Sequence, residues 1–442
     1  MKKAKLILSV VTFIVFLSSL ALANGLNLNS LGSRALAMGG AFVGLADDFS
    51  AIFWNPAGIA QFNQQYFGFY GTGIMPSGKY KMEVPVPGVG TLTMVNAQTK
   101  SKTYLGGLAA YYYPVTEKMV AGFGVYSPSG LGANWDGADF AAISEGETYK
   151  WTSFIRMVTF SPALAYKIND NFCVGATLNI NYGLMDIAMH AGSAVAPLPI
   201  PPYFMEVDLG QYEESMKGWG YGATLGVLVK PSPMVSFGAT YRTASKIKFS
   251  GDASISNLLL LGANDSSDLE REVTWPMWFA AGVAFKPIDN LTLTGDVQWT
   301  QWSKIDVMET DFKDPFWATL MAQSGDDARK MYWDDATQIR FGAEYILNNN
   351  LAVRGGFYID PSPAPDRTMN VLLPNYDFNV ITFGLGYSLN GLQLDFGFEY
   401  LMAKERTIPY EKTLMDPNWE SAMPGVYNMK VAVPNISISY KF

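Results

Sequence analysis

The sequence predicts an all-β fold, a 14-stranded antiparallel transmembrane β-barrel with an N-terminal hatch (plug) inside the lumen. Three observations support it: an export signal, short runs of alternating apolar and polar residues, and connections that alternate between short and long. Charged residues make up only 16% of the chain, below the usual quarter for soluble domains. No run of 18 or more apolar residues follows the signal, so we expect strands rather than helices to cross the membrane.

The first 23 residues are typical of a secretory signal peptide. Three lysines among the first five residues precede an apolar stretch at 6–20, and residues 21–23 (ALA) form a small-x-small cleavage site. Removing the signal would leave a mature chain that starts at Asn24, with 28 basic against 39 acidic residues and a net charge of −11. We therefore expect no nucleic-acid partner, because binding phosphates requires a concentrated basic surface.

Cysteine and histidine are too scarce for common catalytic or metal chemistry. Cys173 is the single cysteine and His190 the single histidine, so we expect no disulfide, no metal site and no cofactor. An outer-membrane lipase would have to use His190, which has no G-x-S-x-G motif nearby. The sequence thus predicts no catalytic residue and no enzyme.

The alternation assigns one face of each strand to lipid and the other to the lumen. In 392–400 (LQLDFGFEY), Leu, Phe and Tyr fall on one parity and Gln, Asp and Glu on the other, and 172–182 and 338–345 behave alike. A soluble β-sandwich also alternates, but charges on the polar parity and Tyr or Trp at the ends of the apolar parity favour a barrel with an aromatic girdle. The predicted lumen charges include Arg242, Asp296, Arg340, Glu344, Arg354, Asp395 and Glu399.

The connections give the number of strands. Six short connections are rich in Gly, Pro, Asn and Asp: 114–118, 167–171, 230–233, 286–290, 347–350 and 388–391. Seven long connections lie near 74–102, 127–152, 185–218, 244–272, 303–335, 360–377 and 403–427. Thirteen connections predict fourteen strands, an even number with both barrel ends on the short-turn side, as in bacterial outer-membrane barrels.

The C-terminus ends in NISISYKF, whose Ile436, Ile438, Tyr440 and Phe442 share one face of a strand. A terminal aromatic on such a strand resembles the signal that the outer-membrane assembly machinery recognises. We therefore expect a multi-pass barrel among the lipids of the bacterial outer membrane, with Phe442 read by that machinery. A closed barrel has no free edge, so we expect a monomer.

The segment 24–64 precedes the first strand and does not alternate. It is too short to fold alone, and a barrel of this size has room for a plug. Gly39, Gly40 and Ala57 would permit close packing against the inner wall, and we expect Asp47 and Asp48 to meet lumen cations such as Arg340 and Arg354. The predicted division is a signal peptide at 1–23, a hatch at 24–64 and a barrel at 65–442.

Residues 32–58 carry a resemblance to a known family. The motif GSRALAMGGA at 32–41, the acids Asp47 and Asp48, and the turn Asn55-Pro56-Ala57-Gly58 look like the N-terminal hatch of the FadL family. Members are outer-membrane transporters of long-chain fatty acids and aromatic hydrocarbons. Together with the strand end at 162–166, the pair at 275–276 and the terminal aromatic, the resemblance spans essentially the whole chain.

The resemblance implies passive diffusion of a hydrophobic ligand from a groove among the outer loops to a site beside the hatch N-terminus. The ligand would then leave sideways into the bilayer through a kink in the third strand, for which Gly122 and Gly124 are the candidates. The apolar loops either bind this ligand or pack on each other over the mouth, and both readings stay open. The candidate ligand-binding residues are Asn24, Leu26, Leu198, Ile200, Phe204, Leu258, Leu260, Phe316, Trp317 and Leu320.

A carboxylate head group would require a cation at the inner site. Arg242, Arg340 and Arg354 have the inward parity, but they fit equally a lattice of ion pairs with Glu344, Asp395 and Glu399 that holds barrel and hatch together. A porin-like channel and a structural or adhesive barrel remain alternatives to the transporter.

Overall fold

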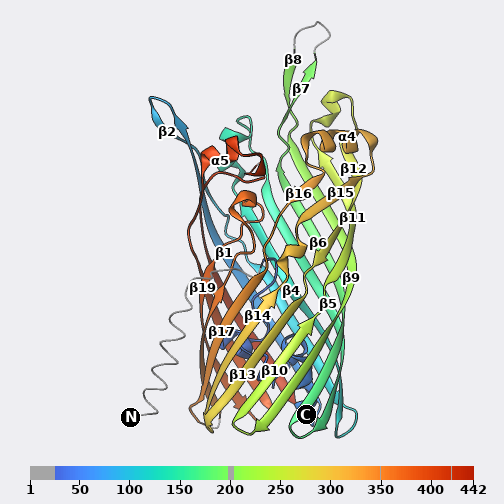
Figure 1. The fold of residues 1–442 in the computed structure, drawn as a ribbon, viewed down its shortest axis with the longest axis vertical. Coiled ribbons are helices and arrows are strands. Elements are labelled where there is room, and N and C mark those ends of the chain that lie inside the picture. The colour runs from blue at the N-terminus through green and yellow to red at the C-terminus, as the bar shows by residue number, and fades with distance from the viewer. Residues whose placement is uncertain (1–24, 198–203, 349, 420) are drawn as a thin grey trace.

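The computed structural model describes residues 25–197, 204–348, 350–419 and 421–442. Within this part of the chain, fourteen transverse strands form one closed antiparallel barrel, as predicted (Figure 1). The ladder between β1 and β22 closes it, running from the Tyr66–Lys441 pair to the Lys81–Val426 pair. The predicted signal peptide lies outside the described residues.

Six of the fourteen barrel strands are interrupted, and each half of an interrupted strand has its own label. The unbroken strands are β1 (Tyr66–Val86), β4 (Met119–Trp135), β5 (Trp151–Asn169), β6 (Phe172–His190), β9 (Gln211–Ser232), β18 (Leu351–Asp360), β19 (Phe378–Leu389) and β22 (Gly425–Lys441). The interrupted ones are β2 (Gly90–Gln98) with β3 (Tyr104–Pro114), β10 (Val235–Arg242) with β11 (Ser245–Ile255), β12 (Ser266–Trp275) with β13 (Trp278–Ile288), β14 (Leu291–Thr300) with β15 (Val307–Phe312), β16 (Ala328–Lys330) with β17 (Ala336–Ile346), and β20 (Leu392–Ala403) with β21 (Arg406–Ile408).

Helices and one small hairpin occupy the segments outside the wall. The hatch contains α2 (Ser33–Ala37), α3 (Ala51–Trp54) and η1 (Pro56–Gln61). The long connections contain η2 (Gly137–Ile143), η3 (Leu258–Leu261), η4 (Trp302–Lys304), α4 (Pro315–Ser324), η5 (Asp366–Thr368), α5 (Tyr410–Met415), η6 (Pro417–Trp419), and the hairpin of β7 (Ser193–Pro197) and β8 (Phe204–Asp208). Among the described residues, no helix is both long and apolar enough to cross a bilayer.

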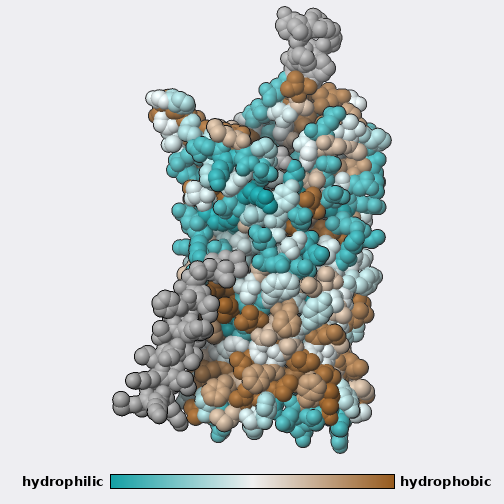
Figure 2. Space-filling model, in the orientation of Figure 1, coloured by the Kyte–Doolittle hydropathy of each residue, from teal (hydrophilic) through white to brown (hydrophobic). Residues whose placement is uncertain are grey.

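The alternation of the sequence is the in–out alternation of the wall. In β20, Leu394 and Phe396 are 38% and 46% exposed on the outer face, whereas Asp395 and Glu399 are buried inside. On the face that Figure 2 shows, apolar residues gather in a band over the short-turn half of the barrel. An apolar outer band over a polar interior is the surface that a bilayer requires of a barrel.

The predicted long connections at 74–102, 185–218 and 244–272 are wrong in extent, because strands occupy most of them. β1 continues to Val86 before β2 returns, β6 runs to His190, and β11 and β12 form a further hairpin. These extensions rise above the apolar band (Figures 1 and 2). Outside a bilayer neither face of a strand has to be uniformly apolar, so the alternation that marks a spanning strand fades there.

Residues 25–64, here called the hatch segment, lie inside the barrel (Figure 1). Backbone amides of the segment bond to the inner wall: Ser33 N donates to Ser437 Oγ (2.9 Å), Gly39 N to Thr382 Oγ1 (3.0 Å) and Val43 N to Asp296 Oδ2 (2.7 Å). Because the segment lacks long regular elements, wall side chains provide partners for its amides.

The motif residues of the hatch segment have definite structural roles. Gly39 and Gly40 both have φ of 66°, a left-handed conformation that favours glycine. A Cβ on Gly39 would lie 2.6 Å from the carbonyl oxygen of Phe341 in the wall. Asn55 caps η1, whose first residue is Pro56, by accepting from Ala57 N (3.1 Å), and its Nδ2 donates to Val227 O of the wall (2.9 Å).

Candidate functional site

An inner cavity of about 140 Å³ lies between the start of the hatch segment and the barrel wall. Its walls come from the start of that segment, including Leu26 and Leu28, from Gly130 of β4, and from Leu372 and Leu373 of the connection between β18 and β19. The volume is roughly that of an engineered apolar cavity that binds benzene, about 150 Å³. A molecule the size of a single aromatic ring therefore fits.

Two carboxyl groups line the inner cavity. Asp360 accepts from Asn29 Nδ2 (2.7 Å) and Gln338 Nε2 (2.5 Å), and Glu399 accepts from the hydroxyl of Tyr358. No Lys, Arg or His occurs among the described residues that line this cavity. A carboxylate ligand would meet two acids there and no cation.

The inner cavity adjoins an interruption in the barrel wall. The β3–β4 ladder ends at the Leu108–Tyr126 pair, and contact resumes at a bridge between Thr99 and Trp135. The wall between these points, residues 101–107 and 127–133, is here called the β3–β4 gap. Within the gap, two hydrogen bonds join the hatch segment to β4. Leu28 N donates to Pro128 O (2.8 Å), and Ser129 Oγ donates to Leu26 O.

The kink lies further along the third strand than predicted. Gly122 and Gly124 pair regularly with Tyr112 and Ala110 of β3 and with residues of β5. The register of β4 against β5 shifts between Tyr126 and Ser129, which indicates a bulge at 127–128. Glycine does not mark the bend; Pro128, which cannot donate to a ladder, lies in it.

An outer cavity of about 650 Å³ lies among the extracellular ends of the strands. Four methionines line it: Met189, Met321, Met331 and Met423. Its ionisable lining residues are His190, Asp326, Arg329 and Lys330. This volume falls within the range of small-molecule sites.

Leu372 and Leu373 line both cavities and so form the partition between them. The backbone of the pair is fixed: Asn370 Oδ1 accepts from Leu372 N and Leu373 N (both 3.0 Å), and Leu372 O accepts from the hydroxyl of Ser153. A ligand that moves from the outer to the inner cavity has to pass these two apolar side chains.

His190 lies at the rim of the outer cavity, where neighbouring side chains hold its ring in place. Its ring stacks on Tyr149 with centroids 4.9 Å apart, and its Nε2 lies 2.8 Å from Asp208 Oδ1. Burial opposes ionisation of Asp208, but hydrogen bonds from Tyr149 and His190 outweigh it and lower the pKa of that carboxyl. The bond to Asp208 in turn raises the pKa of Tyr149 to about 12. Cys173 is a buried wall thiol.

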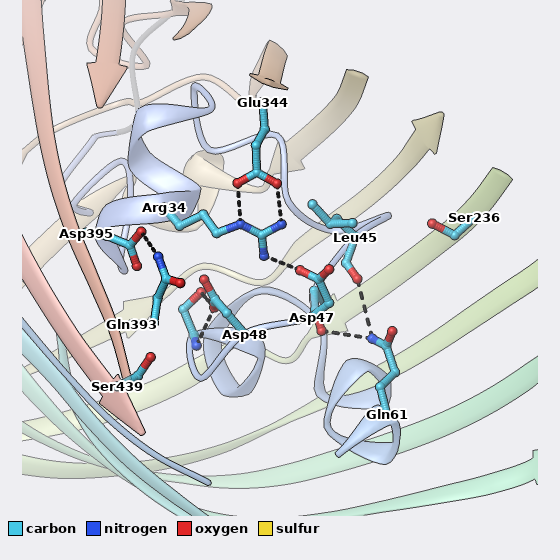
Figure 3. A network of polar contacts seen from close by, with 12 residues as sticks. Arg34, Leu45, Asp47, Asp48, Gln61, Ser236, Glu344, Gln393, Asp395 and Ser439 are labelled. Carbon is cyan, nitrogen blue, oxygen red and sulfur yellow. Dashed lines mark hydrogen bonds and ion pairs between the residues drawn. The ribbon is translucent and has the colours of Figure 1, made fainter. Parts of the chain in front are cut away.

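The hatch acids do not meet Arg340 and Arg354, so that prediction is wrong. Arg34 of the hatch segment donates to both oxygens of Glu344 in the wall (2.7 Å each) and to Asp47 (2.5 Å) (Figure 3). Asp48 accepts from the backbone and hydroxyl of Ser50 (2.8 and 2.6 Å). Hatch and wall are thus joined by a hatch cation and a wall anion, the reverse of the expected polarity.

The three predicted lumen arginines have protein partners and lie away from the inner cavity. Arg354 bridges Glu344 and Asp395 (2.6 Å each), and Arg340 donates to Gly39 O (3.1 Å) and Gln338 Oε1 (2.7 Å). The guanidinium of Arg242 donates to Phe53 O (3.0 Å) and lies on a separate cavity of about 30 Å³. These contacts favour the ion-pair lattice over a head-group site.

The predicted ligand residues are only partly on the cavities. Leu26 lines the inner cavity, whereas Asn24, Leu198 and Ile200 lie outside the described residues, as does the side chain of Phe204. The loop residues Leu258, Leu260, Phe316, Trp317 and Leu320 line neither cavity. Leu258 and Trp317 are fully buried in a common apolar cluster, and Leu260 points to the exterior (73% exposed), so these loops pack on each other.

Sequence reasoning missed Arg329, Asp360 and the pair Leu372–Leu373. A signal existed for the first: 326–330 (DDARK) is a charged run inside a long connection otherwise rich in Met, Trp and Phe. Asp360, Leu372 and Leu373 gave no such signal, because their segments form contacts with residues far away in the sequence.

A closed barrel with an apolar outer band and cavities along its interior belongs to the transmembrane β-barrels of the outer membrane. The family profile described as "Outer membrane protein transport protein (OMPP1/FadL/TodX)" matches residues 14–442, so the chain belongs to this family. It is therefore a transport barrel of the bacterial outer membrane.

Relatives and solved structures agree with this assignment. The chain is 24% identical over 447 residues to the long-chain fatty acid transport protein of Escherichia coli K12, covering 90% of this chain and 93% of that protein. A FadL homologue of Pseudomonas aeruginosa superposes with a TM-score of 0.75 at 16% identity, over 95% of this chain and 100% of the other. The toluene transporter TodX of Pseudomonas putida gives 0.70 at 15% identity, over 96% and 100%.

Proposed function

We propose that the chain lets hydrophobic small molecules pass from the outer cavity to the inner cavity and then through the β3–β4 gap into the bilayer. The observation that carries this proposal is the inner cavity's position at the gap, where Tyr104, Gly130 and Leu131 line both. An apolar molecule that leaves there exchanges a cavity directly for lipid. It avoids re-exposure to water, which costs roughly 25 cal/mol per Å² of apolar surface.

The inner cavity favours an uncharged ligand of about the size of one aromatic ring. The inner cavity offers a carboxylate no cationic partner, and a buried charge without a partner is costly. The relatives' names cover both candidate classes, long-chain fatty acids and toluene. Of these, the volume and the charge of the inner cavity favour the neutral hydrocarbon.

We further propose that residues 24–64 act as a hatch that prevents free passage of solutes, with 1–23 removed as a signal peptide and 65–442 forming the barrel. The many hydrogen bonds between the hatch segment and the wall support this role.

We also propose that the assembly machinery recognises Phe442. Its side chain is 64% exposed, and its amide donates to Gln65 O (3.0 Å). We propose a monomer, because the closed barrel leaves no strand edge for a partner.

Filling the gap tests the proposed path. A Cβ at Gly130 would meet no atom within 4 Å, so Gly130→Trp adds a ring beside the gap without a collision at its first atom. Uptake of a labelled monoaromatic hydrocarbon by cells that lack their own family member should fall more than tenfold. Gly355→Trp, where a Cβ has only one neighbour, 3.9 Å away, is the matched control and should retain uptake. Equal uptake by both variants would refute exit through the gap.

A further inference from the structure

Two cations lie side by side on the outer face of the barrel wall. Arg156 of β5 pairs with Leu184 of β6, and Leu184 pairs with Lys217 of β9, so the three side chains form one row on one face. Ile155 is buried and lines the inner cavity, and successive side chains of a strand point to opposite faces. Arg156 and the rest of the row therefore point outward.

This row lies at the height of the lipid head groups. The exposed Tyr166, near the short-turn end of β5, is ten positions from Arg156. Ten residues at about 3.3 Å each, tilted by roughly 40°, rise about 25 Å, which is the height of the apolar band of such barrels. On β9 the exposed Trp219 and Tyr221 lie between Lys217 and the short turn, as in an interfacial aromatic girdle.

Arg156 has no protein partner that would explain a cation at this height. Within the described chain, its buried Nε has no hydrogen-bond partner, and neither Arg156 nor Lys217 forms an ion pair. Asp186, an acid on the same face of β6, accepts from the hydroxyl of Ser215 (2.6 Å). A buried N–H without a partner is costly, so a bound anion would satisfy that of Arg156.

The space beside Arg156 is open and lies at the outer mouth of the β3–β4 gap. Arg156 pairs with Gly130 of β4, where a Cβ would meet no atom within 4 Å. Phe154, the next outward residue of β5, stacks on Tyr104 with ring centroids 5.9 Å apart. Lys102 Nζ lies 5.2 Å from the ring centroid of Tyr104 and 6.0 Å from that of Phe154. A further cation thus flanks the open space.

The other lysines on the neighbouring outer face have acidic partners. Lys246 and Lys248 of β11 both form ion pairs with Glu272 of β12. The cations of this face that have no ion pair in the described chain are Lys102, Arg156 and Lys217. The unpaired charge beside the gap is therefore positive.

We infer that Arg156 and Lys217, flanked by Lys102, bind the phosphate group of a lipid in the outer leaflet. Lipid phosphates lie at this height, just outside the apolar band. A guanidinium binds phosphate oxygens through charge-assisted hydrogen bonds, and lysine adds a point charge. The acyl chains of the lipid would lie along exposed apolar residues nearer the short turns, such as Leu164 and Leu178. The inference goes beyond the proposed function and does not depend on it, because this site is on the outside of the barrel.

Native mass spectrometry of the full chain in detergent, with EDTA present, tests the inference by titration with lipid A and with its dephosphorylated form. The intact chain should bind lipid A at least tenfold more tightly than the dephosphorylated form. Arg156→Gln should weaken lipid A binding roughly tenfold, the loss expected for a hydrogen bond to a charged group. Lys217→Gln should weaken it about threefold. Both variants should bind the dephosphorylated lipid as the intact chain does, which shows that they remain folded.

Each variant has a matched control. Arg367→Gln removes an exposed loop arginine that lies over the ring of Tyr332, and Lys118→Gln removes an exposed lysine in a short turn at the opposite end of the barrel. Neither control should change lipid A binding. Equal losses in variants and controls, or equal binding of both lipids by the intact chain, would overturn the inference.

Inorganic phosphate separates a lipid site from a site for the free anion. If inorganic phosphate bound the intact chain as tightly as lipid A does, the lipid would be the wrong occupant and the inference would be overturned. Each of these outcomes leaves the proposed uptake path standing, because the lipid titration involves no transported ligand.

Discussion

The outer and inner cavities share the two leucines of the partition but differ in charge. The outer cavity has Arg329, whose buried Nε has no hydrogen-bond partner in the described chain, and the inner cavity has Asp360 and Glu399 without a cation. A carboxylate would therefore find arginine and lysine in the lining of the outer cavity and no cation beyond Leu372 and Leu373. On the proposed path, this difference would favour the passage of apolar, neutral molecules through the inner cavity to the wall gap.

The largest loss of hatch stability is expected from breaking the ion pairs that join the hatch segment to the wall. Arg34→Met leaves Asp47 and Glu344 without their shared cation, at a cost of roughly 3–5 kcal/mol for breaking a buried pair. Hatch amides should exchange hydrogen faster, and planar-bilayer recordings should show larger or more frequent conducting states. Adding Asp47→Asn should restore part of the loss, since Asp47 is the acid left without a cation, whereas Glu344 keeps its contact with Arg354. Unchanged exchange in Arg34→Met would show that this network does not hold the hatch.

A smaller change in hatch stability is expected when the pH is raised and Asp48 ionises. Burial raises the pKa of this carboxyl to about 6, although Arg34 and Ser50 oppose the shift. Because the folded-state pKa lies above the ordinary value of 3.8, hatch stability is greatest below about pH 4 and falls as the pH rises to about 6. The loss is on the order of 2–3 kcal/mol.

Asp48→Asn keeps an acceptor for Ser50 and removes this titration. Compared by hydrogen exchange at each pH, the variant should match the parent at pH 4 and protect the hatch better at pH 8. Better protection at pH 4 alone would contradict the assigned direction of the pKa shift.

The smallest effect, a change in the rate of uptake, is expected from shortening a leucine of the partition between the two cavities. Leu373→Ala widens the passage between the cavities and should raise uptake of a neutral hydrocarbon about threefold, a change of about 0.6 kcal/mol in the barrier. Leu414→Ala, at an exposed leucine in α5 that lines neither cavity, is the control and should change nothing. Equal rates in the two variants would show that Leu373 does not limit passage.

The wall was predictable because a bilayer imposes a simple rule on each strand. The parity of 392–400 places Asp395 and Glu399 inside, and the turns at 114–118 and 388–391 show where strands reverse. The same rule weakens above the membrane, which is why the sequence predicts loops where β1 and β6 extend.

The site was less predictable because its contacts join distant parts of the chain. Arg34 and Glu344 are 310 residues apart, and Arg329 meets Glu214 across 115. Charge and parity place such groups in the lumen or in a loop without saying which pairs meet. The bend at 127–128 was misplaced for a different reason: glycines occur throughout the strands, whereas Pro128 within β4 was the more specific signal.

The difference in charge between the cavities is tested most directly by locating bromine by anomalous scattering in crystals of the full chain. One crystal is soaked with bromobenzene and another with 4-bromobenzoate, which differ only by the carboxylate. Bromobenzene should occupy the inner cavity beside Gly130, and 4-bromobenzoate only the outer cavity beside Arg329. Equal occupancy of the inner cavity by both compounds would contradict the charge selection proposed for this path.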